Sequence, residues 1–253
     1  LFGFEHPDTT QSLNNLAELY VILGDYARAE PLLQRSLKIR EKVLGPDHPD
    51  TAQSLNDLAS LYFKMSDYTR AESLYKRSLK IREKVLGPEH PLTAGSINNL
   101  AHLYFRMSDY KRAEPFYKRA LKIREKVFGP EHPNTAESLN NLSSLYSAMV
   151  DYSRAEPLLQ RSLKIREKVL GPDHPDTATS LNNLALLYTG SGDYARAEPI
   201  YKRALKIREK ILGPDHPQTA TSLGNLGTFY YIKSDNALAE PLLQRSLKIR
   251  EKV

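Results

Sequence analysis

The segment GPDHPDTAQSLNDLASLYFKMSDYTRAESLYKRSLKIREKVL, from Gly45 to Leu86, decides the fold because the whole chain is built from near copies of it. The copies follow one another every 42 residues, and one histidine marks the same place in each: His6, His48, His90, His132, His174 and His216. A fixed period of this length is typical of a stacked array, in which each unit buries its apolar face against its neighbours. We therefore expect a single array over residues 1–253, with repeats at about 3–44, 45–86, 87–128, 129–170, 171–212 and 213–253.

Each copy contains the signals of two helices. In the second copy, Gly45 and Pro46 end the preceding helix, and Pro49 suits the first turn of the next one. Apolar residues then recur at i, i+3, i+4 and i+7 from Leu55 to Tyr62, which predicts a first helix over about 49–65. Asp67 is a candidate N-cap for a second helix over about 68–86.

Two antiparallel helices joined by a short turn form a hairpin, so the predicted fold is all-α, a solenoid of six antiparallel helix hairpins. One irregularity is a proline in the second turn of the second helix, which we expect to bend that helix or delay its start. Five copies carry it, at Pro31, Pro115, Pro157, Pro199 and Pro241, and the remaining copy has Ser73.

The composition narrows the class of protein. The 253 residues include no cysteine, which excludes disulfides, thiolate nucleophiles and cysteine-based zinc sites. No apolar run reaches the ~18 residues of a membrane span, and the first residues lack the layout of a signal peptide. We therefore expect no membrane association and a cytoplasmic location. Because the chain begins and ends inside a copy of the repeat, we interpret it as a fragment of a longer array.

The hairpin resembles the tetratricopeptide repeat, in particular its 42-residue form in kinesin light chains and bacterial arrays. The phrases LNNLA, YKRALKIREKVFG and DHPDTA read closely like kinesin light chain repeats, and the matching residues of the second copy are Leu58, Ala59, Tyr62, Asp67, Tyr68, Ala71, Tyr75 and Ser78. The resemblance implies a right-handed superhelical solenoid that binds an extended peptide or helix on the concave surface lined by the first helix of each pair. Such arrays bind many unrelated partners, so the resemblance does not identify a ligand.

The first helices carry a column of amides beside the buried stripe. Asn56, Ser60 and Phe63 form this column in the second copy, at i, i+4 and i+7, and its first member is asparagine in five copies: Asn14, Asn56, Asn98, Asn140 and Asn182. We predict that these amides offer donors and acceptors to the backbone of an extended peptide; hydrogen bonding to the adjacent repeat is the alternative. For the next column we favour that inter-repeat role: Asn15, Asp57, Asn99, Asn141, Asn183 and Asn225.

Two copies add aromatic and basic groups to the same stretch of the predicted groove. Phe63 with Lys64, and Phe105 with Arg106 and His102, would suit a peptide with an apolar anchor and acidic neighbours. In kinesin light chains, basic residues near this end of the first helix help to select acidic, tryptophan-containing peptides, and only Lys64 and Arg106 match that pattern here. The predicted ligand is therefore a protein or peptide segment, acidic with an apolar anchor, bound in the middle of the array.

The remaining polar motifs indicate no catalytic chemistry. One loop histidine with Asp47 or Glu89 provides too few ligands for a metal, and adjacent hairpins stack roughly 10 Å apart. We therefore expect the loop histidines to cap or pack the loops. No glycine-rich phosphate loop and no oriented nucleophile and base are present. We expect no catalytic residue, no metal and no cofactor, and a scaffold that is not an enzyme.

The net charge of +6 indicates that the chain also has a basic surface, apart from the predicted groove. Lys76, Lys80 and Lys84 form a stripe on the second helix, which we interpret as a solvated convex face; contact with nucleic acid is the alternative. Arg82 returns to the core side of that helix, as do its equivalents Arg40, Arg124, Arg166, Arg208 and Arg250. There we predict an ion pair or stacking contact between repeats, with a loop or turn acid as the partner.

The last copy departs from the others and leaves alternatives open. We expect Leu242, Leu247 and Ile249 to be exposed there, which would allow end-to-end self-association with another molecule. The main functional hypothesis is a protein–protein interaction scaffold whose peptide groove is lined by the first helices. The competing hypothesis is a structural or sensing array within a larger signalling ATPase.

Overall fold

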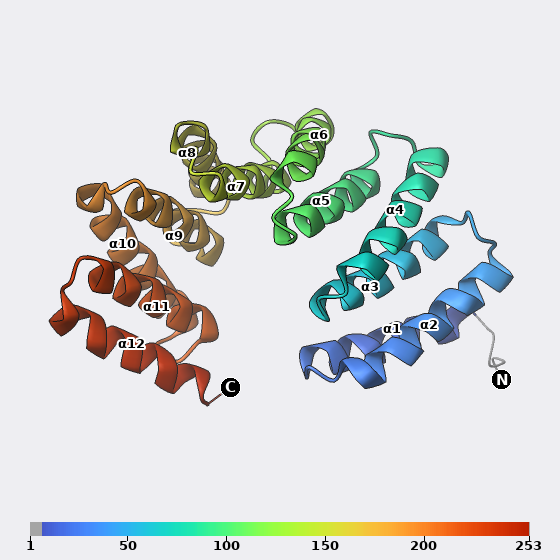
Figure 1. Cartoon of the computed structure of the whole chain (residues 1–253), viewed down its shortest axis with the longest axis horizontal. Coiled ribbons are helices and arrows are strands. Elements are labelled where there is room, and N and C mark those ends of the chain that lie inside the picture. The colour runs from blue at the N-terminus through green and yellow to red at the C-terminus, as the bar shows by residue number, and fades with distance from the viewer. Residues whose placement is uncertain (1–6, 253) are drawn as a thin grey trace. The chain divides into compact units, whose positions relative to one another are not determined.

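The computed structural model describes residues 7–252, which form twelve α-helices and no strand (Figure 1). The helices of the first three copies are α1 (Pro7–Ile22), α2 (Tyr26–Val43), α3 (Pro49–Lys64), α4 (Tyr68–Val85), α5 (Pro91–Arg106) and α6 (Tyr110–Phe128). Those of the last three are α7 (Pro133–Ala148), α8 (Tyr152–Val169), α9 (Pro175–Gly190), α10 (Tyr194–Leu212), α11 (Pro217–Ile232) and α12 (Asn236–Arg250). The all-α prediction is confirmed for the described residues.

The chain divides into two compact units, the first ending at Val127 and the second beginning at Phe128. Helices α1–α6 make three hairpins in the first unit, and α7–α12 make three in the second. Within the first unit, α2 packs against α3 and α4 against α5; within the second, α8 packs against α9 and α10 against α11. The second helix of one hairpin therefore covers the first helix of the next, as in a stacked array.

The predicted start and stop signals act as expected. Gly45 has a φ of +95°, the left-handed conformation that ends α2 and that glycine adopts without steric cost. The Asp67 side chain accepts a hydrogen bond of 3.0 Å from the backbone N–H of Arg70 and so caps α4. His48 caps α3 through Nδ1, which accepts from the N–H of Asp50 at 3.1 Å. The capping role is confirmed for five of the loop histidines; His6 lies outside the described residues.

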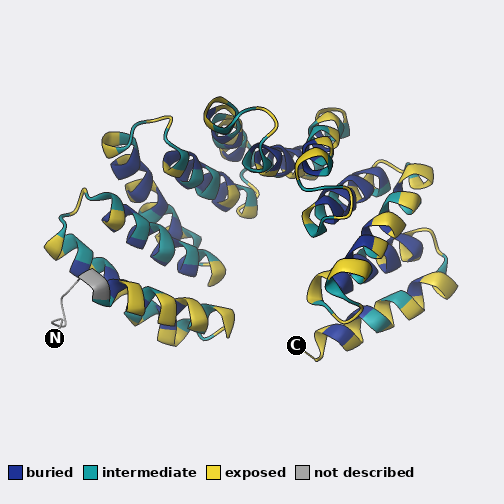
Figure 2. Ribbon diagram, turned by 180° about the vertical axis from the view of Figure 1, so that it is seen from behind, coloured by how far each residue is buried: buried dark blue, intermediate teal, exposed yellow. Residues whose placement is uncertain are grey.

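Small and branched apolar side chains fill the facing sides of the helices, where the buried residues gather in Figure 2. In the second hairpin, Ala52, Leu55 and Ile81 form one buried cluster, and Leu37 of the preceding hairpin packs against it. Clusters of this kind bury apolar area in two hairpins at once, which links each hairpin to its neighbour within a unit.

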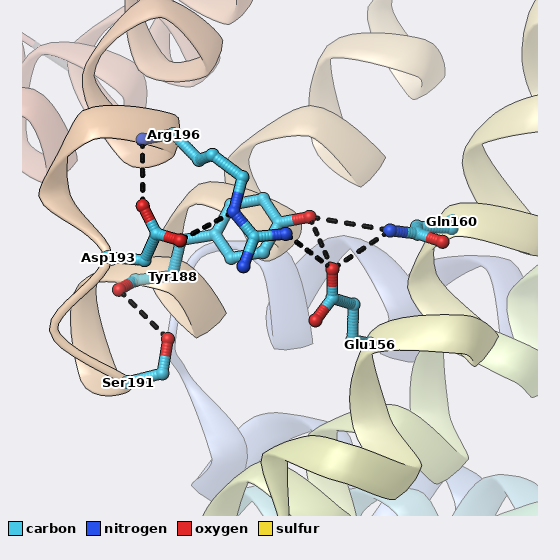
Figure 3. A network of polar contacts seen from close by, with 6 residues as sticks. All are labelled: Glu156, Gln160, Tyr188, Ser191, Asp193 and Arg196. Carbon is cyan, nitrogen blue, oxygen red and sulfur yellow. Dashed lines mark hydrogen bonds and ion pairs between the residues drawn. The ribbon is translucent and has the colours of Figure 1, made fainter.

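A polar network also joins successive hairpins, as Figure 3 shows for the second unit. The Tyr188 hydroxyl of α9 donates to Glu156 Oε1 of α8 at 2.8 Å. The Arg196 guanidinium lies 4.0 Å above the Tyr188 ring and donates to Glu156 at 2.7 Å and to Asp193, the N-cap of α10, at 2.6 Å. Glu72, Tyr104, Arg112 and Asp109 repeat this arrangement in the first unit. Each network ties three helices of two hairpins together.

Two structural expectations need correction. Helix α2 starts at Tyr26 and continues through Pro31, so the proline does not delay the start of the helix. In the last hairpin Leu247 is 57% exposed, as predicted, but Ile249 is only 2% exposed and Leu242 is half-buried. The reason is that Ile249 packs on Ala220 and Leu223 of its own hairpin, with Leu242 against the same cluster. Association of copies through this face stays a prediction.

Candidate functional site

The structure brings together four of the residues predicted to contact a ligand. Phe63 comes from α3, and His102, Phe105 and Arg106 come from the last turns of α5; we call these four residues the aromatic patch. The His102 ring centroid lies 5.0 Å from that of Phe63 and 6.4 Å from that of Phe105. The Arg106 guanidinium carbon lies 5.8 Å from the Phe63 ring centroid. Rings from neighbouring hairpins thus lie together with one cation over the Phe63 ring, an arrangement suited to an aromatic ligand side chain.

The patch offers both apolar area and positive charge. Phe63 and Phe105 are half-buried, whereas His102 and Arg106 are exposed at the surface, as is Lys64 at the end of α3. Partial burial between the two rings lowers the pKa of His102, and the charge of Arg106 lowers it further. His102 is therefore neutral at pH 7, and the positive charge comes from Arg106 and Lys64.

The predicted amide column is less open than expected. Asn140 is 6% exposed and Asn182 is 3% exposed, and Asn182 Nδ2 donates to Ser222 Oγ of the next hairpin at 2.8 Å. In the first unit, Asn56 Oδ1 accepts from Asn99 Nδ2 at 2.8 Å, which confirms the inter-repeat role predicted for Asn99. The predicted ligand contact is therefore wrong at Asn140 and Asn182, because both amides are buried and Asn182 bonds the next hairpin. Ligand contact at the half-buried amides stays a prediction: Asn14, Asn56 and Asn98.

A pocket lies beside the aromatic patch, and the sequence did not predict it. It has a volume of about 440 Å³, lies between α1 and α3, and is lined by Asn14 and Lys64 together with Gln53 and Asp57. The available signal was Asp57 itself, the one acid in a column that is otherwise asparagine. In the second unit a smaller pocket of about 240 Å³ lies between α7 and α9 and is lined by serine and leucine side chains with Tyr152.

The second helices are basic, but many of their cations are paired with acids. Lys84 of α4 reaches Asp47, in the loop before α3, at 2.5 Å, and Lys210 of α10 reaches Asp173 at 2.6 Å. Lys126 pairs with Glu89 and Lys168 with Glu131 in the same way. The positive charge predicted for a solvated face is thus partly neutralised by acids in the loop that leads into each hairpin. This pairing reduces the charge available to phosphate groups.

Arg82 is buried between repeats as predicted, but its partners differ from the expected acid. Its side chain is 4% exposed, and Nη1 donates to the carbonyl oxygen of Leu92 at 3.1 Å and to Ser96 Oγ at 2.8 Å. Nη2 donates to Gln53 Oε1 at 2.6 Å. The planar guanidinium satisfies several neutral acceptors at once, which a single loop acid cannot provide. The loop acids pair with exposed lysines instead.

Residues 7–252 hold no group of three or more histidine, aspartate or glutamate side chains that could bind a metal ion. No helix within that range is both long enough and apolar enough to span a membrane.

Comparison with known families identifies the repeat. The family model described as tetratricopeptide repeat matches residues 8–84, 56–126, 92–168, 148–210 and 191–252. Because these segments together cover almost the whole chain, the chain belongs to the tetratricopeptide repeat family. Proteins of this family generally mediate protein–protein interactions, and the fold is typically a non-catalytic scaffold. No curated protein matches the sequence.

Solved structures extend the likeness to kinesin-light-chain-like arrays. BtubC (BKLC) from P. vanneervenii superposes with a TM-score of 0.73 at 29% identity, over 90% of this chain and 91% of that one. A Podosopora anserina structure, described as a candidate kinesin light chain with nearly identical TPR-like repeats, gives 0.71 at 28% identity, over 82% of this chain and 98% of that one. A signal transduction ATPase from Pyrococcus horikoshii with a tetratricopeptide repeat sensor gives 0.69 at 18% identity, over 96% of this chain and 36% of that one, and shows the fold alone.

Proposed function

We propose that this chain binds an extended acidic peptide on the first helices of its first unit, with an aromatic or other apolar side chain of the peptide on the aromatic patch. The observation that carries the proposal is the packing of Phe63, His102 and Phe105 from two hairpins, with the Arg106 cation above the Phe63 ring. An aromatic anchor buries apolar area between the two phenylalanines, and acidic neighbours pair with Arg106 and Lys64.

The second unit provides an internal contrast. The positions equivalent to Phe105 and Arg106 hold Ser147 and Ala148 in the fourth copy, and Thr189 and Gly190 in the fifth. The last copy has Tyr231, which is exposed, followed by Ile232 at the position equivalent to Arg106. An aromatic residue followed directly by a basic one at these two positions therefore occurs only in the second and third copies, which supports a ligand site in the first unit.

The test is the affinity of the whole chain for a fluorescein-labelled acidic peptide with one tryptophan, measured by fluorescence anisotropy. Phe105→Ser and Arg106→Ala introduce residues that the chain already carries at the equivalent positions 147 and 148, so both variants are expected to fold. Phe105→Ser should weaken binding about tenfold, because it removes a buried apolar contact. Arg106→Ala should weaken it about threefold and reduce its dependence on salt, because the lost charge is exposed.

Tyr231→Ser is the matched control, since it removes an exposed aromatic at the equivalent position of the last copy. Its affinity should equal that of the wild type. The proposal is wrong if the wild type does not bind the peptide, or if Tyr231→Ser weakens binding as much as Phe105→Ser does.

The alternatives have less support. The likeness to the sensor of a signalling ATPase rests on 18% identity and concerns the fold, so it gives no reason to prefer a sensing role. Nucleic-acid binding by the second helices is opposed by the pairing of their lysines with loop acids, for example Lys210 with Asp173. A persistent complex with random DNA at 150 mM salt would restore that alternative.

A further inference from the structure

The pocket between α1 and α3 differs in chemistry from the rest of the first-helix surface. It is concave, with a volume of about 440 Å³, and its lining includes the carboxylates of Glu18 and Asp57 and the amide of Asn14. Lys64 also lines it, and the aromatic patch begins one residue earlier, at Phe63. The pocket therefore adjoins the proposed peptide site within the first unit.

Asp57 is a carboxylate that no other copy has, in a pocket lined by two carboxylates, Glu18 and Asp57, and two cations, Arg40 and Lys64. The equivalent position is an amide in every other copy: Asn15, Asn99, Asn141, Asn183 and Asn225. Gln53 Nε2 donates to Asp57 Oδ1 at 2.7 Å, as Gln11 Nε2 does to Asn15 Oδ1 in the first copy. An amide therefore satisfies the local hydrogen bond equally well, so the structural role of this position does not require a carboxylate.

Acceptor positions in the pocket remain open to a further donor. A carboxylate has about four acceptor positions, and the side chains of Gln53 and Asn56 hydrogen-bond to Asp57. Asn14 Oδ1 is buried and receives no hydrogen bond within the described part of the chain. The same is true of Asn140 and Asn182 in the second unit, whereas Asn14 lines the 440 Å³ pocket, which is large enough for a ligand group.

The nearest cation in the lining, Arg40, uses one end of its guanidinium for other partners. Arg40 Nη1 is engaged by the carbonyl oxygen of Asp50 at 2.9 Å and by Ser54 Oγ at 3.0 Å. Burial raises the pKa of Asp57 although the hydrogen bond from Gln53 and the charges of Arg40 and Arg82 lower it. Lys64 is exposed at the edge of the pocket and is not among the charges that act on Asp57.

We propose that this pocket binds the ammonium group of a lysine side chain, supplied by the peptide that occupies the neighbouring aromatic patch. An ammonium group is a compact cation with three donors, which matches the Asp57 carboxylate, Asn14 Oδ1 and the Glu18 carboxylate. The inference rests on the proposed function and adds a second specificity element to it: a lysine at a fixed distance from the apolar anchor.

The spacing follows from the geometry of the array. Packed helices lie about 10 Å apart, and an extended peptide rises about 3.3 Å per residue, so the lysine should stand about three residues from the anchor. The probes are two acidic tryptophan peptides, with lysine three residues before or three residues after the tryptophan, and their norleucine counterparts. Norleucine keeps the apolar stem of lysine and removes the charge.

For the wild-type chain, one of the lysine peptides should bind about tenfold more tightly than its norleucine counterpart in anisotropy titrations. Non-specific electrostatics predicts the opposite sign, because the chain carries a net charge of +6. In Asp57→Asn the two peptides should bind equally, and this variant should fold because five copies carry asparagine there. Asp215→Asn removes an exposed carboxylate in the second unit and should keep the preference.

The inference is overturned if neither lysine peptide gains affinity over norleucine, or if the preference survives in Asp57→Asn. Failure of all four peptides to bind the wild type contradicts the proposed function. A second measurement then decides whether the pocket binds an ammonium group. Millimolar n-butylammonium should shift the side-chain amide signals of Asn14 and Gln53 in ¹H–¹⁵N spectra of the wild type but not of Asp57→Asn. The absence of these shifts in the wild type would equally overturn the inference.

Discussion

At the residue scale, the neighbours of His102 determine the protonation state of its ring within the aromatic patch. Its ring lies between Phe63 and Phe105 and close to Arg106, and these surroundings disfavour the charged imidazolium. The folded pKa is below the unfolded value of about 6.5, so the neutral ring favours folding above that pH. As the pH falls from the unfolded to the folded pKa, this contribution to stability is lost.

Arg106→Ala should raise the pKa of His102, because it removes one of the two causes that lower it, while partial burial keeps the value below that of a free histidine. The measurement is an NMR titration of the His102 ring protons in both proteins. Lys80→Ala, which removes an exposed cation from α4, is the control and should leave the titration unchanged. A pKa that stays the same in Arg106→Ala would mean that the two side chains are not near each other in solution.

Side-chain partners were the hardest feature to predict from the sequence. The 42-residue period and the helix signals gave the hairpins and the neighbourhood of Phe63, His102 and Phe105, because local propensity and spacing decide both. The partners of Arg82 and the burial of Asn182 depend on how the next hairpin packs, which residue spacing within one helix does not specify. Asp57 stands out in the sequence as the one acid at its position, but its role could be inferred only from the pocket around it.

At the element scale, the turn between the two helices of a hairpin requires a left-handed residue. Glycine provides it in two turns, Gly24 with a φ of +74° and Gly192 with +81°. The other described turns of this type place a side chain there, at Ser66, Ser108, Val150 and Ser234, with φ between +58° and +62°. Val150, with φ +59°, is the most strained because it is β-branched, and its side chain is exposed, so it gains little from burial.

Val150→Gly should therefore stabilise the second unit by about 1 kcal/mol, even though glycine increases the entropy of the unfolded chain. Thermal unfolding followed by circular dichroism should show a Tm increase of about 2–4 °C. Val150→Ala is the control, because alanine removes the branched side chain but keeps the Cβ that causes the strain. Equal gains from the two variants would show that the side chain, and not the backbone conformation, limits the stability of this turn.

At the scale of the whole molecule, both units use carboxylates whose pKa values lie below the ordinary range. Hydrogen bonds from Lys202, Tyr230 and Lys233 lower the pKa of Glu198 to about 2, against a smaller opposing effect of burial. The N-cap carboxylates share this direction through their bonds to arginine, as at Asp67 and Asp193. Because these groups bind protons more readily in the unfolded state, their contribution is present above about pH 4.5 and is lost as the pH falls toward 2.

The free energy of unfolding should thus decrease steeply between about pH 4.5 and 2. Glu198→Gln should make this decrease shallower. The variant should lose less than about 1 kcal/mol of stability at pH 7, because solvent screens the ion pairs of Glu198. The measurement is urea unfolding across this pH range. Glu240→Gln changes the equivalent position of the last hairpin, where Gln244 is the hydrogen-bond partner, and should leave the slope unchanged. A Glu198→Gln profile parallel to the wild type would contradict this assignment.

The central claim is that the first helices of the first unit hold the ligand. The most direct measurement replaces the tryptophan of the acidic peptide with the photoreactive amino acid benzoylphenylalanine and maps the crosslinks on the whole chain by mass spectrometry. We predict crosslinks to α3 and α5 at Phe63, His102 or Phe105 and their loss on competition with the tryptophan peptide. Specific, competable crosslinks confined to the second helices or to the second unit would contradict the claim.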